Sequence, residues 1–198
     1  MIRGTGKWVS VLAVALASAA VGASVKPLPA FERVMALNEP RKVVDITLTD
    51  QHGRSRKLSS LAGKPAFVFF GFTNCPDVCP TTLRKLALIK RAYAGELGEI
   101  RVVFISVDGE RDTPAVMNDY LQAFSKDFVG LTARSDEVRK LALGLSAPFF
   151  KNPPKNGEYN VEHASRVFAL DKLGRLRAEL YEASPEAVVG IAKALLAE

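Results

Sequence analysis

Two runs of apolar residues mark the centre of this chain. FVFFGF (67–72) and IRVVFISV (100–107) are apolar almost throughout, as is typical of strands that a sheet buries on both faces. Between them, residues 81–97 place leucine, alanine, isoleucine and tyrosine at helical spacing. Two buried strands joined through a helix predict a parallel crossover unit, the core of an α/β sheet.

The flanking segments extend this unit. Further strands are predicted at 43–50, 128–132, 165–170 and 175–181. Further helices are predicted at 114–126, at 136–143 with Ser135 as cap, and from Pro185 onward. The last two strands form an antiparallel hairpin across a short polar turn. We therefore predict a mixed central sheet flanked by helices, with a cysteine pair where the first crossover helix begins, which is a thioredoxin-like α/β fold.

The N-terminus has the pattern of an export signal. Residues 1–8 carry Arg3 and Lys7 without an acidic residue, and an apolar or small-residue run follows at 9–22. The run is shorter than the roughly 20 residues that comfortably span a bilayer, so cleavage and retention as an anchor both stay open. We predict an exported, periplasmic protein, soluble or tethered to the inner membrane. Its parts are a signal or anchor (1–23), a linker (24–42) and one folded domain (43–198).

Charge narrows the class of partner. The formal net charge is +6, but the basic residues are dispersed and no basic stripe with interleaved aromatic residues occurs. We therefore expect no nucleic-acid binding. A solvated, moderately basic surface is the simpler interpretation, and a basic face turned toward anionic lipid or an acidic partner is the alternative.

The chain has two cysteines, Cys75 and Cys79, in the stretch TNCPDVCPTTL. Each precedes a proline, and residues before proline avoid the helical region. We therefore expect Pro80 at the first helical position and both thiols just before the helix, at the carboxyl end of a buried strand. Open α/β sheets bind ligands at that edge, and a helix N-terminus lowers the pKa of nearby thiols.

Three roles are open to this pair. A disulfide across so short a loop would contribute only about 2 kcal/mol. A redox couple is chemically reasonable, although three residues separate the thiols where the familiar dithiol motif has two. A metal site needs a third ligand, which His163, just before the late hairpin, could supply; His52 is expected to be a solvated turn residue. Two thiolates and an imidazole suit Cu(I), whereas Cu(II) would need a further oxygen ligand and zinc a fourth ligand.

Three blocks of the sequence resemble the SCO/SenC family of cytochrome c oxidase assembly factors. They are DITLTDQHGRSRKLSSLAGKPAFVFFGFTNCPDVCP, VVFISVDGERDTP and VEHASRVFALDKLGRL. The resemblance implies a thioredoxin-like fold on the outer side of a membrane and copper held by Cys75, Cys79 and His163. The departures are small, since Asp108-Gly109 stands where the family usually has Asp-Pro and Glu162 where it usually has Asp.

The resemblance also implies a function and partners. We expect a metallochaperone rather than an enzyme, one that delivers copper to the dinuclear copper centre of an oxidase subunit and meets a copper donor protein or a thiol reductant. The alternative is a thiol–disulfide oxidoreductase, in which Cys75 and Cys79 form the redox-active pair and reduce cysteines of that subunit or of other exported proteins. A copper or redox sensor would share the same site.

Two further features have structural interpretations. Asp108 follows the second buried strand, and we interpret it as part of a turn before the next helix, whose cap is Asp112 or Thr113. The loop 146–160 is long for a compact domain, and we hypothesise that it moves His163 relative to the thiols.

Overall fold

One eight-stranded sheet forms the centre of the molecule, in the strand order β1-β10-β9-β4-β5-β6-β2-β3. The computed structural model describes residues 25–154 and 159–198, so the predicted signal or anchor lies outside the described residues. The strands are β1 (Val34–Arg41), β2 (Thr47–Asp50), β3 (Ser55–Lys57), β4 (Ala66–Gly71), β5 (Arg101–Ser106), β6 (Val129–Thr132), β9 (Val167–Leu170) and β10 (Leu176–Leu180). A separate antiparallel pair consists of β7 (Phe149–Lys151) and β8 (Val161–His163).

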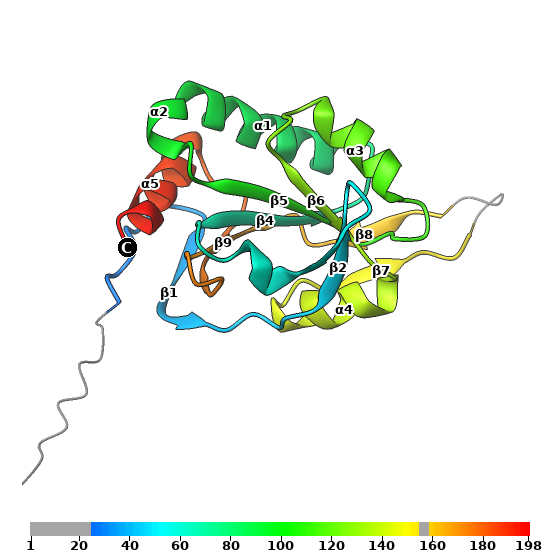
Figure 1. The fold of residues 1–198 in the computed structure, drawn as a ribbon. Coiled ribbons are helices and arrows are strands. Elements are labelled where there is room, and N and C mark those ends of the chain that lie inside the picture. Colours follow the sequence, from blue (N-terminus) through cyan, green and yellow to red (C-terminus); the bar gives the residue numbers. More distant parts are fainter. Residues whose placement is uncertain (1–24, 155–158) are drawn as a thin grey trace, which may run out of the picture.

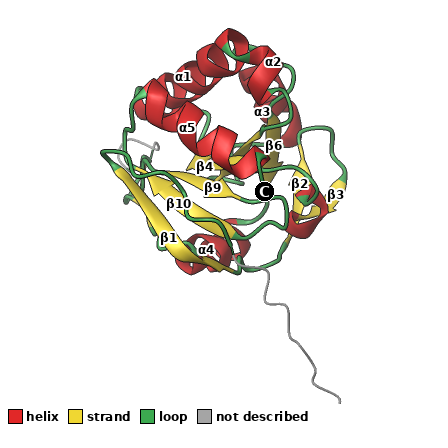
Figure 2. Cartoon of the chain, turned by 90° about the vertical axis from the view of Figure 1, so that its left-hand side faces the viewer, coloured by secondary structure: helices red, strands yellow, loops and turns green. Residues whose placement is uncertain are grey.

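Helices cover both faces of the large sheet. They are α1 (Val78–Ala92), α2 (Ala94–Leu97), α3 (Pro114–Gln122), α4 (Ser135–Gly144) and α5 (Pro185–Leu196), with a 3-10 helix, η1, at Leu58–Leu61. Figures 1 and 2 show α1, α3 and α5 on one face and α4 on the other. Because both faces are covered, every residue of β4 is buried, as its continuous apolar run predicts.

The sheet is mixed. β4 runs parallel to β5, and β5 runs parallel to β6, whereas β9 is antiparallel to both β4 and β10. The unit β4–α1–β5 is the predicted parallel crossover, and β9–β10 is the predicted late hairpin. The α/β architecture, a mixed central sheet between helices, is therefore confirmed.

Local capping explains where two of the helices begin. Thr113 precedes α3, and its Oγ1 accepts a hydrogen bond from the amide of Val116 at 3.4 Å. Ser184 caps α5 in the same way, and a proline at the first helical position follows each cap. The predicted cap of α4 is wrong, because Ser135 is already helical and its hydroxyl donates to the carbonyl of Val107 and the carboxylate of Glu110.

The predicted linker, 24–42, contains an edge strand. β1 pairs antiparallel with β10, with Val34 opposite Leu180, so the linker prediction is wrong for residues 34–41. Phe31, just before this strand, lies against α5 so closely that a Cβ on Gly190 would come within 2.2 Å of its ring. The ordered domain therefore begins before the predicted boundary at residue 43.

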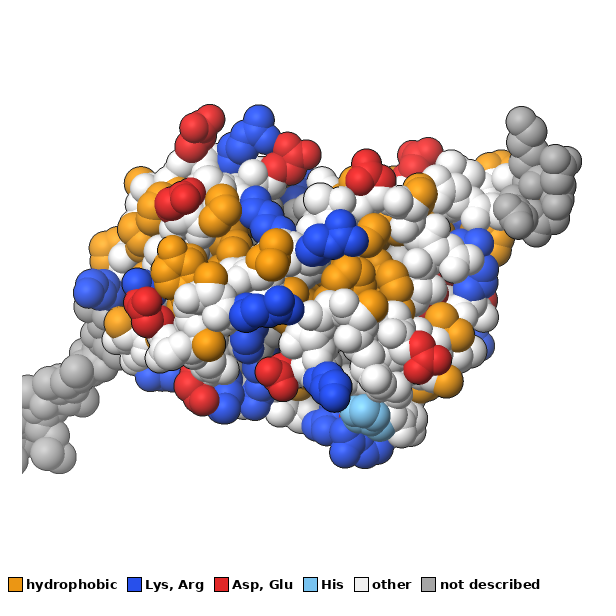
Figure 3. Space-filling view, turned by 90° about the horizontal axis from the view of Figure 1, so that it is seen from above, with side chains coloured by type: hydrophobic (Ala, Val, Ile, Leu, Met, Phe, Trp, Pro, Cys, Tyr) orange, Lys and Arg blue, Asp and Glu red, His pale blue; other side chains and the backbone are white. Residues whose placement is uncertain are grey.

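Charged side chains are interspersed over the helical face of the molecule. Figure 3 shows acidic and basic groups scattered around apolar patches on this face, and the exposed apolar residues of α1, α3 and the α1–α2 junction include Leu88, Tyr93 and Val116. This distribution agrees with the dispersed charge of the sequence. Within the described ranges, no helix has both the length and the apolar character needed to cross a membrane.

Candidate metal centre

Both cysteines lie at the carboxyl end of β4, as predicted. Cys75 is half-buried in the loop after β4, and its amide donates to the carbonyl of Phe72 at 3.2 Å. Cys79 is fully buried in the first turn of α1. The helix begins at Val78 rather than at Pro80, so the predicted start is wrong by two residues. Proline is tolerated there because the amides of a first turn have no partner within the helix.

His163 is the last residue of β8, in the small sheet β7–β8, and approaches the thiols from there. Its Nε2 lies 3.4 Å from Sγ of Cys79. The ligand atoms of Cys75, Cys79 and His163 all lie within 4.8 Å of one another, and in the described part of the chain they are the one group of three or more potential ligands so arranged. The predicted site residues thus come together, whereas His52 lies exposed in the turn after β2.

The spacing of these atoms suits a three-coordinate ion. Metal–sulfur bonds of about 2.3 Å and metal–nitrogen bonds of about 2.0 Å, set 120° apart, place ligand atoms about 3.7–4.0 Å from each other. The separation between Nε2 of His163 and Sγ of Cys79 is 3.4 Å, slightly shorter than this range, and no pair of ligand atoms is more than 4.8 Å apart. Small movements would therefore close the group around an ion. Two thiolates and one imidazole are a soft donor set, and Cu(I) accepts three ligands of this kind.

Hydrogen bonding sets the orientation of the histidine ring. Nδ1 of His163 lies 3.1 Å from the carbonyl oxygen of Ala164, so Nδ1 is the donor and the lone pair of Nε2 points toward the thiols. Phe69 and Phe72 contact the ring edge-on, with centroids 6.0 and 5.8 Å away. Burial lowers the pKa of His163, which keeps the imidazole neutral and able to bind a metal at neutral pH.

The direction of the pKa shift of the Cys79 thiol is opposite to the predicted one. Burial, supported by the neighbouring Cys75, raises the pKa of Cys79, although it lies at the helix N-terminus that was predicted to lower it. Loss of hydration disfavours the charged form more strongly than the helix dipole favours it. Metal binding at this site therefore has to displace a proton.

Two carboxylates beside the site were interpreted too simply from the sequence. Asp112 does not cap α3; it accepts hydrogen bonds from the amide and hydroxyl of Thr73, at 3.0 and 2.7 Å, in the loop that leads to Cys75. Asp108 is fully buried and contacts the segment that carries His163, so its interpretation as a turn residue alone is wrong. The available signal was the position of Asp108, which comes two residues after the buried strand β5, whose carboxyl end lies beside that of β4, the strand before the cysteines. Asp112 comes four residues further along the chain.

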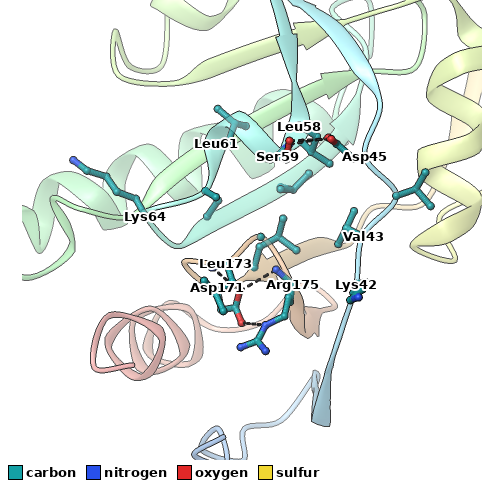
Figure 4. A pocket seen from close by; sticks show the side chains of 16 residues that line it. Lys42, Val43, Asp45, Leu58, Ser59, Leu61, Lys64, Asp171, Leu173 and Arg175 are labelled. Atoms are coloured by element: carbon teal, nitrogen blue, oxygen red, sulfur yellow. Dashed lines mark hydrogen bonds and ion pairs between the residues drawn. The ribbon is translucent and has the colours of Figure 1, made fainter. Parts of the chain in front are cut away.

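A cavity of about 310 Å³ lies elsewhere and does not belong to this centre. Figure 4 shows its lining, which includes Leu58, Leu61 and Arg175. The cavity reaches Ala66, the first residue of β4, whereas the cysteines follow the last residue of that strand. The cavity and the cysteines therefore lie at opposite ends of β4.

Comparison with known proteins identifies relatives of this chain. Residues 36–196 match the family described as SCO1/SenC. An SCO2-like protein of Rickettsia felis is 30% identical over 152 residues, which cover 75% of this chain and 74% of that protein.

Solved structures of Sco proteins share the fold. Bradyrhizobium japonicum ScoI, solved with copper bound, superimposes with a TM-score of 0.71 at 36% identity, over 77% of this chain and 98% of that chain. BsSco, described as a member of the Sco family of cytochrome c oxidase assembly proteins, shares the fold with a TM-score of 0.66 at 21% identity, over 83% of this chain and all of that chain. The thioredoxin-like fold is thereby confirmed, and the chain belongs to the SCO1/SenC family.

Proposed function

We propose that this protein is a copper metallochaperone that holds copper through Cys75, Cys79 and His163 and delivers it for assembly of the dinuclear copper centre of cytochrome c oxidase. The observation that carries the proposal is the convergence of two thiols and an imidazole whose ligand atoms lie within 4.8 Å of one another. The thiols come from the loop after β4 and the start of α1, and the imidazole comes from β8. The copper bound to the Bradyrhizobium relative and the assembly role stated for the family of BsSco support it.

The burial of the ligands suits a carrier. Cys79 is fully buried, while Cys75 is partly exposed. Val78, which directly precedes Cys79, is 41% exposed. A partner's thiolates can reach the ion from the Cys75 side and replace the ligands one at a time, while Cys79 and His163 keep it from water. The receiving partner is the copper-binding oxidase subunit, and an exported location would place both proteins in the same compartment.

Titration with Cu(I) against a chromophoric chelator tests this function. The reduced protein should bind one equivalent tightly, and His163→Ala should weaken binding strongly. His52→Ala is the matched control, because His52 is the other histidine of the chain and lies exposed in a turn. Equal affinities for wild type and His163→Ala would contradict the proposed ligand set.

A thiol–disulfide oxidoreductase is the second candidate. Both cysteines are free thiols in the structure, and an accessible Cys75 next to a buried Cys79 resembles an attacking thiol beside a resolving one. Reduction of a partner disulfide would need both cysteines and would not need His163. Measuring that activity in His163→Ala therefore separates the two functions: retained activity with lost Cu(I) binding identifies the reductase.

A further inference from the structure

The hairpin that carries His163 is not part of the large sheet. β7 and β8 pair with each other, Phe149 opposite His163 and Lys151 opposite Val161, and form a two-stranded sheet of their own. Two short strands are marginally stable alone. The position of His163 relative to the thiols therefore depends on side-chain contacts between this hairpin and the domain.

Asp108 supplies such contacts from the carboxyl end of β5. Its carboxylate is fully buried and accepts a 2.6 Å hydrogen bond from the hydroxyl of Tyr159. The ammonium of Lys151 lies 3.1 Å from the same oxygen. Tyr159 lies shortly before β8 and Lys151 ends β7, so one carboxylate holds both sides of the hairpin.

Arg111 adds a second connection. Its guanidinium pairs with Asp108, donates to the carbonyl of Tyr159 at 3.0 Å and stacks on the Tyr159 ring with 3.8 Å to the centroid. It also lies 5.9 Å from the centroid of Phe72, whose ring contacts His163 edge-on. Arg111 thus lies between Tyr159, just before β8, and Phe72, at the start of the loop that carries Cys75.

The turn 108–112, which contains Asp108 and Arg111, also contacts the segment that carries the thiols. Asp112 accepts from the amide and hydroxyl of Thr73, at 3.0 and 2.7 Å, and from the hydroxyl of Ser106 at 2.6 Å. Thr73 lies two residues before Cys75. The turn 108–112 therefore contacts the histidine side through Asp108 and Arg111 and the thiol side through Asp112.

We propose that Asp108 and Arg111 are positioning residues for the metal centre: they set the separation between His163 and the thiol pair, and so the Cu(I) affinity, without touching the ion. The proposal rests on the proposed ligand set. Its physical basis is preorganisation, because a hairpin already held against the site loses less conformational freedom when the ion binds.

The test compares two buried carboxylates in the full-length, reduced protein. Asp108→Asn removes the charge that holds the hairpin. Asp171→Asn is the matched control, since Asp171 is also buried (2% exposed), also pairs with an arginine, Arg175, at 2.7 Å, and follows Leu170, which lies opposite Ala66 at the far edge of the sheet. Circular dichroism verifies that each variant is folded.

Asp108→Asn should weaken Cu(I) binding about 10- to 100-fold, the usual loss when a group supporting a metal ligand is removed, while Asp171→Asn should bind like wild type. The double variant Asp108→Asn/His163→Ala should bind no more weakly than His163→Ala alone, because a residue that acts through His163 has nothing left to position. Additive losses would overturn the proposal, as would wild-type affinity in folded Asp108→Asn.

Metal-free amide exchange gives an independent readout. Exchange at 159–163 should accelerate in Asp108→Asn and in the milder variant Tyr159→Phe, which loses one hydroxyl, while exchange at 75–79 stays unchanged. Unchanged exchange at 159–163 in both folded variants would refute the positioning role. This readout does not depend on copper. If His163→Ala bound copper like wild type, the proposed ligand set would fail, and exchange would still decide the role of Asp108.

Discussion

His163 Nε2 lies 3.4 Å from Cys79 Sγ, although 84 positions separate the two residues in the chain. The contact joins the first turn of α1 to the end of β8, two elements that belong to different parts of the fold. A metal at this point would link them directly. We therefore expect copper binding to depend on the protonation of these two side chains and to slow amide exchange in β8.

Copper binding should depend on pH with a definite sign. Burial raises the pKa of Cys79, so its thiol is protonated at neutral pH and must lose its proton to bind. Burial lowers the pKa of His163, so its imidazole is already neutral there. We expect Cu(I) affinity to rise with pH, by up to about tenfold per pH unit for each proton displaced. Chelator competition at several pH values measures the slope, and a flat profile from pH 6 to 8, corrected for the chelator's own protonation, would contradict this expectation.

Replacing Gly71 should disturb the thiol site from within the core. A Cβ at this position would lie 2.7 Å from Sγ of Cys79 and 2.7 Å from the ring of Phe104. Gly71→Ala should therefore displace the thiol, weaken Cu(I) binding and destabilise the fold by about 1–3 kcal/mol, the usual cost of overpacking. Gly95→Ala in α2 is the control, since a Cβ there meets nothing within 4 Å. Denaturant titration should leave Gly95→Ala at least as stable as wild type; equal destabilisation of both variants would argue against a local clash.

A buried carboxylate outside the candidate metal centre should control acid stability. Asp50 is 1% exposed and accepts hydrogen bonds from the amide of His52 and from Arg54 and Arg56. Burial alone raises the pKa of Asp50, but these hydrogen bonds outweigh it and lower the pKa well below 3.8. The stabilisation is therefore fully present above that unfolded value and is lost as pH falls toward the folded pKa.

Asp50→Asn tests this linkage. The substitution should cost about 1–3 kcal/mol at pH 7, because it leaves partly buried donors without their anionic acceptor. The stability difference from wild type should shrink as the pH falls from 4 toward 2. Asp136→Asn, at an exposed ion pair, is the control and should change stability little. A difference that grows on acidification would show that the sign is wrong.

Amide exchange with and without Cu(I) tests the movement hypothesised for the loop 146–160. We expect copper to slow exchange in β7, in β8 and at Tyr159, because a metal bond to His163 closes the hairpin onto the thiols. Amide exchange in the β9–β10 turn, which lies at the opposite end of the strands, should not change when copper binds. No change across the described residues 149–154 and 159–163 would remove the hypothesis.

The buried elements were the predictable part of the fold. The apolar run of β4 and the capping signals at Thr113 and Ser184 are local, and each predicted its element correctly. β1 was missed because it lies at an edge of the sheet and its burial does not alternate. Five of its eight positions are exposed, and the three half-buried ones, Val34, Leu37 and Pro40, are three residues apart. β7 and β8 were missed because three residues are too few for a periodic pattern.

The cluster of Cys75, Cys79 and His163, proposed here as the metal ligands, could be selected from the sequence for a different reason. With two cysteines and two histidines in the chain, few ligand sets exist, and the family resemblance selected one of them. The roles of Asp108 and Arg111 were not predictable, because their partners Lys151 and Tyr159 are about 40 residues or more away. Only the tertiary structure brings such residues together. The pKa of Cys79 was missed likewise, since burial cannot be read from its neighbours in sequence.

Because His163 lies on the separate hairpin β7–β8 while the thiols lie in the loop after β4 and at the start of α1, the hairpin is an exchangeable part of the molecule. β7 and β8 share no strand pairing with the eight-stranded sheet, so changes in the hairpin leave the ladder hydrogen bonds of the core intact. Substitutions there could retune copper affinity while the thiol pair and its scaffold stay constant. For protein engineering, this offers a graded series of copper donors built on one framework, each matched to an acceptor of different strength.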